Sequence, residues 1–191
     1  MVPARTLADA LPRRGSAVDA LLIVLGSVFV ALGAQIAIPL PFTDVPITGQ
    51  SFAVLLTGML LGSRRGALAM LLYLLEGAAG LPVFAGGAAG AALFAGKTAG
   101  YLLAFPLAAF VTGVLAERGW DREPLRAAAG MFIGSLVVLT LGSLVLSLFV
   151  GGLERGFLLG FVPFLPGDVV KTAFAAAALP GAWRLIGRPR G

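Results

Sequence analysis

The chain has 191 residues, of which 59% are hydrophobic and 12% are charged, and its formal net charge is +5. A soluble domain carries about 25% charged residues, and a disordered chain is poor in hydrophobic residues, so the composition excludes both classes. There is no Cys and no His, which removes disulfides, thiolate nucleophiles, imidazole bases and the usual zinc ligands. We therefore predict a membrane protein and expect no metal site.

Long apolar stretches predict an all-α, polytopic bundle, because a membrane span needs about 20 mostly apolar residues. In chain order we expect about six transmembrane helices, at residues 18–38, 47–61, 66–80, 98–116, 125–150 and 169–186. No linker is long enough to separate domains. Residues 1–191 are therefore expected to form a single transmembrane domain, with tails at residues 1–16 and 187–191.

The distribution of Lys and Arg predicts the orientation, since cytoplasmic segments are enriched in both. With the N-terminus inside, the outer segments hold only Lys97 and Arg155, and Lys171 lies within a span. The inner segments then hold Arg5, Arg13, Arg14, Arg64, Arg65, Arg118, Arg122, Arg126, Arg184, Arg188 and Arg190. Both termini are expected to be cytoplasmic. Because the basic residues are dispersed in short clusters, we expect no nucleic-acid partner.

The first predicted helix carries small residues at a spacing of four, which places them on one helix face. The pairs are Ser16 with Ala20 and Ser27 with Ala31. Small residues let helix backbones approach closely in lipid. Such a face either docks a partner protein in the membrane or packs against the other helices of the chain.

The outer segment that follows holds three prolines within residues 39–46, which forbid a regular helix there. It is either a plain connection or an ordered lid, and a stiff proline loop suits a lid because it loses little entropy on ordering. The predicted lid residues are Pro41, Phe42, Thr43 and Val45.

A glycine-rich outer segment, residues 80–100, contains Gly86, Gly87, Gly90 and Gly96. Irregular backbone at membrane depth is tolerated where it lines a cavity or is buried in protein, and glycine lets the backbone approach a ligand. Close helix packing through small residues is the alternative. Gly96-Lys97-Thr98 alone does not make a phosphate-binding loop.

Ionisable residues inside a span usually mark function. Asp168 and Lys171 lie three apart on one helix face, after a Pro-Gly helix-start signal. They form either a self-satisfied ion pair with a helix cap or a clamp for a polar ligand.

Other charges lie near the outer end. Lys97 opens a helix at its positive end, where water or an anionic ligand must compensate its charge, unless it reaches to the interface. Tyr101 follows one turn later as a ligand candidate. Glu76 either pairs with Lys97 or Lys171 or bonds a ligand directly.

Four segments together resemble the BioY family, the biotin-binding S components of energy-coupling factor (ECF) transporters. They are residues 35–41 (Gln-Ile-Ala-Ile-Pro-Leu-Pro), 45–50 (Val-Pro-Ile-Thr-Gly-Gln), 73–87 (Tyr-Leu-Leu-Glu-Gly-Ala-Ala-Gly-Leu-Pro-Val-Phe-Ala-Gly-Gly) and 164–171 (Phe-Leu-Pro-Gly-Asp-Val-Val-Lys). One segment departs from the family, which often shows Gly-Pro-Thr-Gly-Gly-Tyr where residues 96–101 read Gly-Lys-Thr-Ala-Gly-Tyr.

The resemblance implies a six-helix S component with both termini inside and an outer biotin pocket capped by the loop after the first helix. It implies that Asp168 and Lys171 belong to that pocket, and we expect Lys97, Tyr101, Glu76, Phe84, Gly86 and Gln50 to line it as well. Lys97 is the candidate partner of the biotin carboxylate.

The expected function is high-affinity biotin capture in the cytoplasmic membrane of a prokaryote, with no catalysis and no catalytic cofactor. The resemblance implies a transmembrane coupling subunit and ATPase subunits as partners, and only these would use ATP, since the chain has no Walker A motif. The alternatives are an S component for another vitamin or a biotin precursor, or a small intramembrane enzyme that uses Asp168, Glu76 and Lys171.

Overall fold

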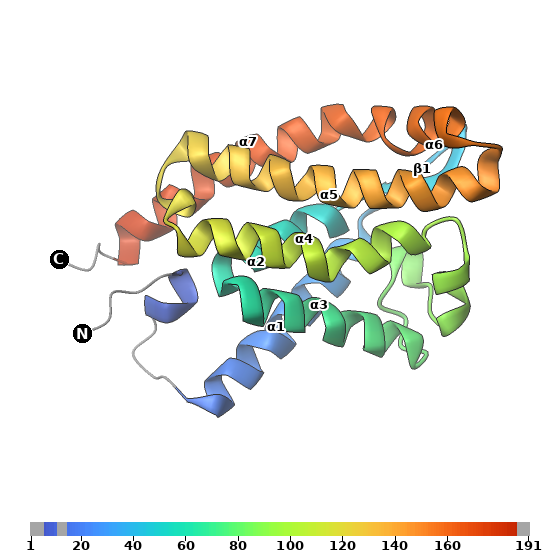
Figure 1. Cartoon of the computed structure of the whole chain (residues 1–191). Helices are drawn as coiled ribbons and strands as arrows, with labels where there is room; N and C mark the ends of the chain where they lie inside the picture. Colours follow the sequence, from blue (N-terminus) through green and yellow to red (C-terminus); the bar gives the residue numbers. More distant parts are fainter. Residues whose placement is uncertain (1–5, 11–14, 187–191) are drawn as a thin grey trace.

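A computed structural model describes residues 6–10 and 15–186 of the protein. Six helices lie side by side in a bundle (Figure 1), and a shorter helix, α6 (Leu153–Gly160), lies at one end. The six are α1 (Ser16–Gln35), α2 (Gln50–Leu61), α3 (Ser63–Ala78), α4 (Ala99–Glu117), α5 (Pro124–Val150) and α7 (Leu165–Ile186). The all-α prediction is confirmed.

Short elements connect these helices. Five 3-10 turns are η1 (Leu7–Ala10), η2 (Ala85–Gly87), η3 (Ala91–Ala95), η4 (Trp120–Arg122) and η5 (Val162–Phe164). Two strands, β1 (Ala37–Leu40) and β2 (Thr43–Thr48), form an antiparallel hairpin between α1 and α2. The turns η2 and η3 belong to the glycine-rich segment between α3 and α4.

The bundle presents an apolar surface that suits lipid. Four segments of the described chain are long and apolar enough to cross a membrane, namely Ser16–Gln35, Ala99–Glu117, Pro124–Val150 and Leu153–Leu185, which runs through α6 and α7. Large side chains on their outer faces are exposed, including Leu32, Leu103 and Leu148. Helices satisfy their own backbone groups in hydrocarbon, so this is a multi-pass membrane protein.

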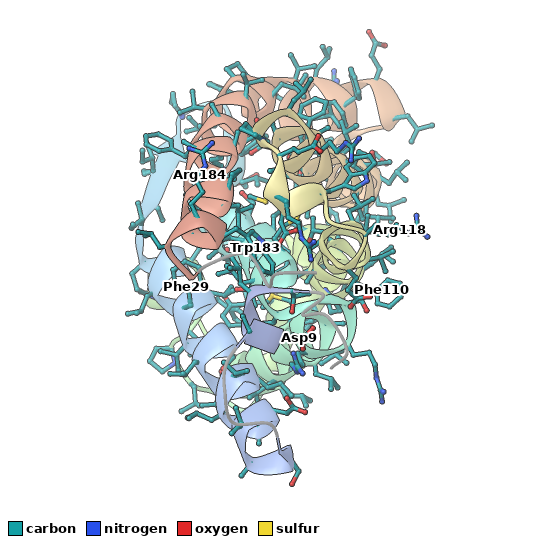
Figure 2. All side chains as sticks on the ribbon, turned by 90° about the vertical axis from the view of Figure 1, so that its left-hand side faces the viewer. Asp9, Phe29, Phe110, Arg118, Trp183 and Arg184 are labelled. Atoms are coloured by element: carbon teal, nitrogen blue, oxygen red, sulfur yellow. The ribbon has the colours of Figure 1, made fainter. Side chains whose placement is uncertain are left out.

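The first and last described elements lie at the same end of the bundle (Figure 1), where η1 contacts α7. Figure 2 views the molecule from this end and labels Arg118 and Arg184 there. The charge distribution predicts an even number of crossings, which would return the chain to its starting side of the membrane. The predicted tail 187–191 and five of the counted arginines, Arg5, Arg13, Arg14, Arg188 and Arg190, lie outside the described residues.

Part of the predicted N-terminal tail packs against the bundle. Leu7 in η1 is buried, and the carboxylate of Asp9 pairs with the guanidinium of Arg65 at 3.0 Å. Arg65 also pairs with Asp19 at the start of α1, at 2.8 Å. This end of the bundle is therefore closed by a short segment that precedes the first long helix.

Helix boundaries follow local signals. Pro124 opens α5, where its missing N–H costs nothing, and Gly151 ends it with a positive φ of 90°. The prediction of 169 as the start of the last helix is wrong, because α7 begins at Leu165 and takes Pro166 into its first turn. The helix α6 was not predicted, since its eight residues merged with the following apolar run.

The proline segment is ordered, and it is a hairpin rather than a loop. Ala37 pairs with Thr48 and Ile38 with Ile47, with an irregular register before the turn. Proline is tolerated because each strand of a two-stranded sheet is an edge strand. The first helix thus ends at Gln35, three residues before the predicted boundary.

The predicted docking face on α1 requires a correction. Ser27 is fully buried, and its hydroxyl donates to the carboxylate of Glu76 on α3 at 3.1 Å. Ala31 is half-buried and packs against the core. Ser27 therefore faces the chain's own helices, whereas Ser16 and Ala20 at the other end of α1 are exposed.

Candidate functional site

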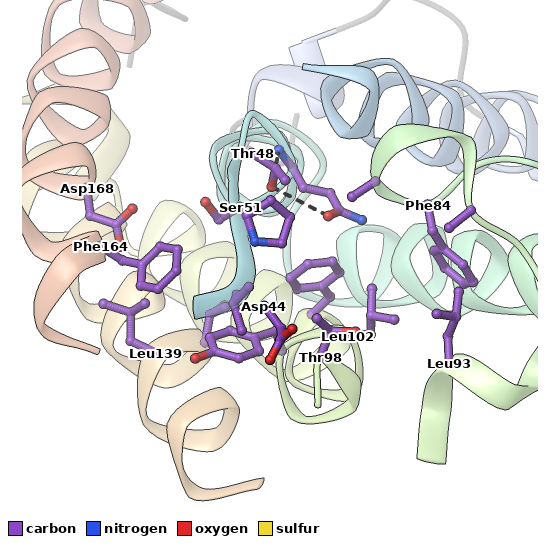
Figure 3. A pocket seen from close by; sticks show the side chains of 18 of the residues that line it. Asp44, Thr48, Ser51, Phe84, Leu93, Thr98, Leu102, Leu139, Phe164 and Asp168 are labelled. Carbon is purple, nitrogen blue, oxygen red and sulfur yellow. Dashed lines mark hydrogen bonds between the residues drawn. The ribbon is translucent and has the colours of Figure 1, made fainter. Parts of the chain in front are cut away.

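A cavity of about 310 Å³ lies beside the hairpin (Figure 3), at the end of the bundle opposite η1 and the end of α7 (Figure 1). Its walls come from β2, the start of α2, the glycine-rich segment, the start of α4, the middle of α5 and the start of α7. A volume of about 300 Å³ is at the lower end for small-molecule sites. Apolar side chains form most of the walls, and the charged residues among the lining are Asp44, Asp168 and Lys171.

The most deeply buried charged residue of the cavity lining is Asp168, which is 3% exposed. It accepts one hydrogen bond from the hydroxyl of Ser135 on α5 and another, at 3.1 Å, from the ammonium of Lys171. The ammonium also donates to the hydroxyl of Ser51 on α2, at 2.8 Å. Three helices therefore meet at one buried ion pair.

Local structure explains why this pair lies here. Asp168 is in the first turn of α7, where the helix dipole favours a carboxylate. Lys171 follows one turn later on the same face. An ammonium has three N–H donors and a carboxylate accepts about four hydrogen bonds, so both groups keep capacity for a polar ligand.

A second series of hydrogen bonds supports the wall of the cavity. The amide of Gln50 donates a very short hydrogen bond to the hydroxyl of Tyr73 on α3, which donates in turn to the carbonyl of Val83 at 2.9 Å. Gln50 lines the cavity, whereas Tyr73 is fully buried outside it. These hydrogen bonds connect the start of α2, through α3, to the glycine-rich segment.

Aromatic rings form much of the apolar wall. Phe84 packs between Tyr73, at 5.4 Å between ring centroids, and Phe94, at 5.9 Å. Its ring occupies the space that a Cβ on Gly77 would need, at 2.0 Å. Tyr101 lines the cavity with its ring, while its hydroxyl donates to the carbonyl of Gly160 at 2.6 Å.

The hairpin closes one side of the cavity. Asp44, Val45, Pro46 and Thr48 line it from β2. The carboxylate of Asp44 pairs at 2.6 Å with the ammonium of Lys97, a residue that lies just before α4. The charge of Lys97, which opposes the helix dipole at the start of α4, is thus compensated by a carboxylate of the chain itself.

The structure brings half of the predicted site and lid residues together around the cavity. Those that line the cavity are Asp168, Lys171, Tyr101, Phe84, Gln50 and the lid residue Val45. Those outside its lining are Lys97, Glu76, Gly86 and the lid residues Pro41, Phe42 and Thr43. Among the described residues Glu76 forms no ion pair with Lys97 or Lys171, so that predicted pairing is wrong; its side chain accepts the hydrogen bond from Ser27 instead.

Sequence reasoning missed several lining or supporting residues. Ser51 and Ser135 hold the ion pair, and Asp44 holds Lys97. A serine in an apolar helix gives no signal by itself, because its meaning depends on which helix face meets the cavity. Asp44 carried a weak signal as the one charge within the proline segment.

A multi-pass helical protein with a capped, mostly apolar cavity and one buried ion pair belongs to the class of membrane proteins that bind a small molecule. The sequence profile of the BioY family matches residues 7–188. The chain belongs to the BioY family.

Three relatives match this chain over most of their own length. The biotin transporter BioY of Rhizobium etli is 42% identical over 174 residues, which cover 87% of this chain and 91% of the relative. The biotin transporter BioY of Thermotoga maritima is 40% identical over 157 residues, with coverage of 81% and 90%. A probable biotin transporter BioY of Pyrococcus horikoshii is 38% identical over 156 residues, with coverage of 80% and 90%.

A solved structure shares the fold. The crystal structure of the S-component for biotin from an ECF-type ABC transporter matches with a TM-score of 0.76 and 25% sequence identity. The match covers 94% of this chain and 96% of the other. The chain therefore has the S-component fold of a transporter family rather than that of an enzyme.

Proposed function

We propose that this protein captures biotin as the substrate-binding subunit of an ECF-type ABC transporter. The observation that carries the proposal is the ion pair of the buried Asp168 and the partly buried Lys171 at the wall of a mostly apolar cavity. Burial of an ion pair costs desolvation energy. A pair at the wall of a cavity can offset this cost by forming hydrogen bonds with a ligand. The names of the relatives supply the candidate ligand.

The chemistry of biotin complements this cavity. Its ureido ring has two N–H donors and one carbonyl acceptor, and the rest is an apolar bicycle and chain that end in a carboxylate. The Asp168 carboxylate suits a ureido N–H, and the Lys171 ammonium suits the ring carbonyl. Apolar and aromatic walls, including Phe105, Val138 and Phe164, suit the bicycle and chain.

Transport requires energy from other subunits. The sequence has no Walker A motif, so ATP hydrolysis is assigned to ATPase subunits that act through a transmembrane coupling subunit. The exposed face at the start of α1, with Ser16 and Ala20, is proposed to dock the coupling subunit. We assign the protein to the cytoplasmic membrane of a prokaryote, with both termini in the cytoplasm and the cavity facing outwards.

The test is to identify the small molecule that co-purifies with the detergent-solubilised protein. Mass spectrometry of the released ligand is expected to show biotin in the wild-type protein and much less in Asp168→Asn. Another vitamin or a biotin precursor in its place would assign the same site to a different S component.

A further inference from the structure

The pair of Lys97 and Asp44 joins the hairpin to the rest of the bundle. The two residues are 53 positions apart, and their charged atoms lie 2.6 Å from each other. Within residues 6–10 and 15–186, this is the one polar side-chain bond that ties residues 37–47 to another part of the chain.

Apolar packing also holds the hairpin. Val45 is buried at 5% exposure, and Leu40 and Ile47 are partly buried and pack against the core, whereas Ile38 and Phe42 are more than half exposed, at 58% and 54%. At its base, Gly49 donates its backbone N–H to the carbonyl of Ile36 at 3.0 Å, which fixes the hinge rather than the tip. Separation of Asp44 from Lys97 would leave only the apolar contacts of Val45, Leu40 and Ile47 to keep the hairpin closed.

The hairpin forms a wall of the cavity, so its closure controls access to the ligand. Asp44, Val45 and Pro46 line the cavity from β2, and Thr98 lines it beside Lys97. We propose that the Asp44–Lys97 ion pair is a latch that holds the hairpin closed and sets how long a ligand stays bound. This proposal rests on the proposed function for the ligand, but the latch itself is a property of the chain.

The latch changes the expected role of Lys97. Its ammonium is neutralised by Asp44 and does not line the cavity. A ligand with a charged tail and a ligand with a neutral tail should therefore be retained alike. Loss of the latch should speed the release of biotin and of biotin amide by the same factor, whereas loss of a carboxylate anchor would affect biotin alone.

Opening of the hairpin can be measured without any ligand. The chain has no Cys, so Val45→Cys provides a single buried thiol on strand β2 of the hairpin, and Phe42→Cys provides an exposed control at the turn of the same hairpin. The rate of maleimide labelling in detergent reports how often the buried thiol opens. It is compared in four backgrounds: wild type, Asp44→Asn, Lys97→Gln and the exchange Asp44→Lys with Lys97→Asp.

Exposed ion pairs contribute up to about 1 kcal/mol, so each single variant should raise the labelling rate at position 45 by about two- to fivefold. The exchange should restore the wild-type rate to within about a factor of two. The rate at position 42 should stay unchanged. Salt should speed labelling at position 45 in the wild type but not in the single variants, since it screens exposed charges.

Release rates of labelled biotin and biotin amide complete the test. Equal acceleration of both in Lys97→Gln, reversed in the exchange, supports the latch. Unchanged labelling in the single variants, no recovery in the exchange, or faster release of biotin alone would overturn it. A wild-type protein that fails to bind biotin but shows the labelling pattern would refute the proposed function and leave the latch standing.

Discussion

The ammonium of Lys171 donates a hydrogen bond to the hydroxyl of Ser51 at 2.8 Å, across 120 positions of sequence. This bond joins α7 to α2, and the same ammonium pairs with Asp168 on its own helix. Opposite walls of the cavity thus meet at one cation. A ligand that bonds to this pair would contact a group that is already held rigidly in place.

The ion pair provides the first prediction. Asp168→Asn keeps the size of the side chain but loses a charged acceptor, which is worth about 1.5–3 kcal/mol. Biotin affinity should fall roughly 10- to 150-fold. Lys171→Ala should be at least as damaging, because it leaves the buried carboxylate without its cation. Equilibrium binding to the purified protein measures both losses.

Ser143 supplies a matched control for that experiment. It is a buried serine on α5 like Ser135, but its hydroxyl donates to the carbonyl of Thr140, whereas that of Ser135 donates to Asp168. Ser143→Ala should leave biotin affinity unchanged. Normal affinity in folded Asp168→Asn and Lys171→Ala would show that the pair is only structural.

Orientation in the membrane is a second prediction. Lys97 and Arg155 lie near the cavity end, whereas Arg64 and Arg118 lie at the opposite end, and all four are exposed. Single-Cys variants at positions 97 and 155 should react with a membrane-impermeant reagent in intact cells. Positions 64 and 118 should react only after the cells are broken, and the reverse pattern would contradict the assigned orientation.

A third prediction concerns pH and Asp121, in the turn η4 outside the spanning segments. Its carboxylate is buried and accepts a hydrogen bond from the indole N–H of Trp183 at 2.6 Å, while its other oxygen has no partner among the described residues. Burial raises the pKa of Asp121 from 3.8 to about 6. The folded state therefore binds more protons than the unfolded state between these values.

The sign of the pH effect follows from this difference. The free energy of unfolding should fall as pH rises from about 4 to about 6, by at most about 3 kcal/mol from this group. Asp121→Asn should flatten that dependence and raise the midpoint of thermal unfolding in detergent at about pH 7.5. An unchanged pH profile in the variant would mean that Asp121 does not titrate in this window.

Docking to a partner is the fourth prediction. Ala20 is exposed at the start of α1, so Ala20→Trp should leave biotin binding intact but block assembly with the coupling subunit and uptake. Ala129→Trp, an exposed alanine on α5 at the same end, is the control and should assemble normally. If Ala20→Trp loses biotin binding in the isolated protein, this face packs internally and the docking assignment is wrong.

The sequence predicts the parts of this protein that depend on local signals. Apolar length located the helices, and the Pro-Gly signal with Asp168 and Lys171 located the polar end of the cavity. Contacts between distant segments left no local trace. Ser51 and Ser135 look like ordinary helix residues. Asp44, the partner of Lys97, lies 53 positions away in the sequence. It belongs to a strand of the hairpin, and the prolines of this segment predicted only that it is not helical.

The packing partner of small residues on a helix also cannot be predicted from their spacing alone. The spacing of Ser27 and Ala31 fits a docking face and an internal face equally well, and only the position of α3 decides that Ser27 is internal. Glu76 likewise has two candidate cations in the sequence, Lys97 and Lys171, yet its side chain accepts a hydrogen bond from Ser27 on the neighbouring helix.

Calorimetric titration of the isolated, detergent-solubilised wild-type protein with biotin and with lipoic acid measures whether the Asp168–Lys171 pair recognises a ureido group. Biotin should bind with one site per chain. Lipoic acid has a similar carboxylate tail on an apolar ring but no ureido group, so it should show no saturable binding, because the Asp168–Lys171 pair would gain no hydrogen bonds from it. Absence of biotin binding, or equal affinity for both compounds, would contradict the account.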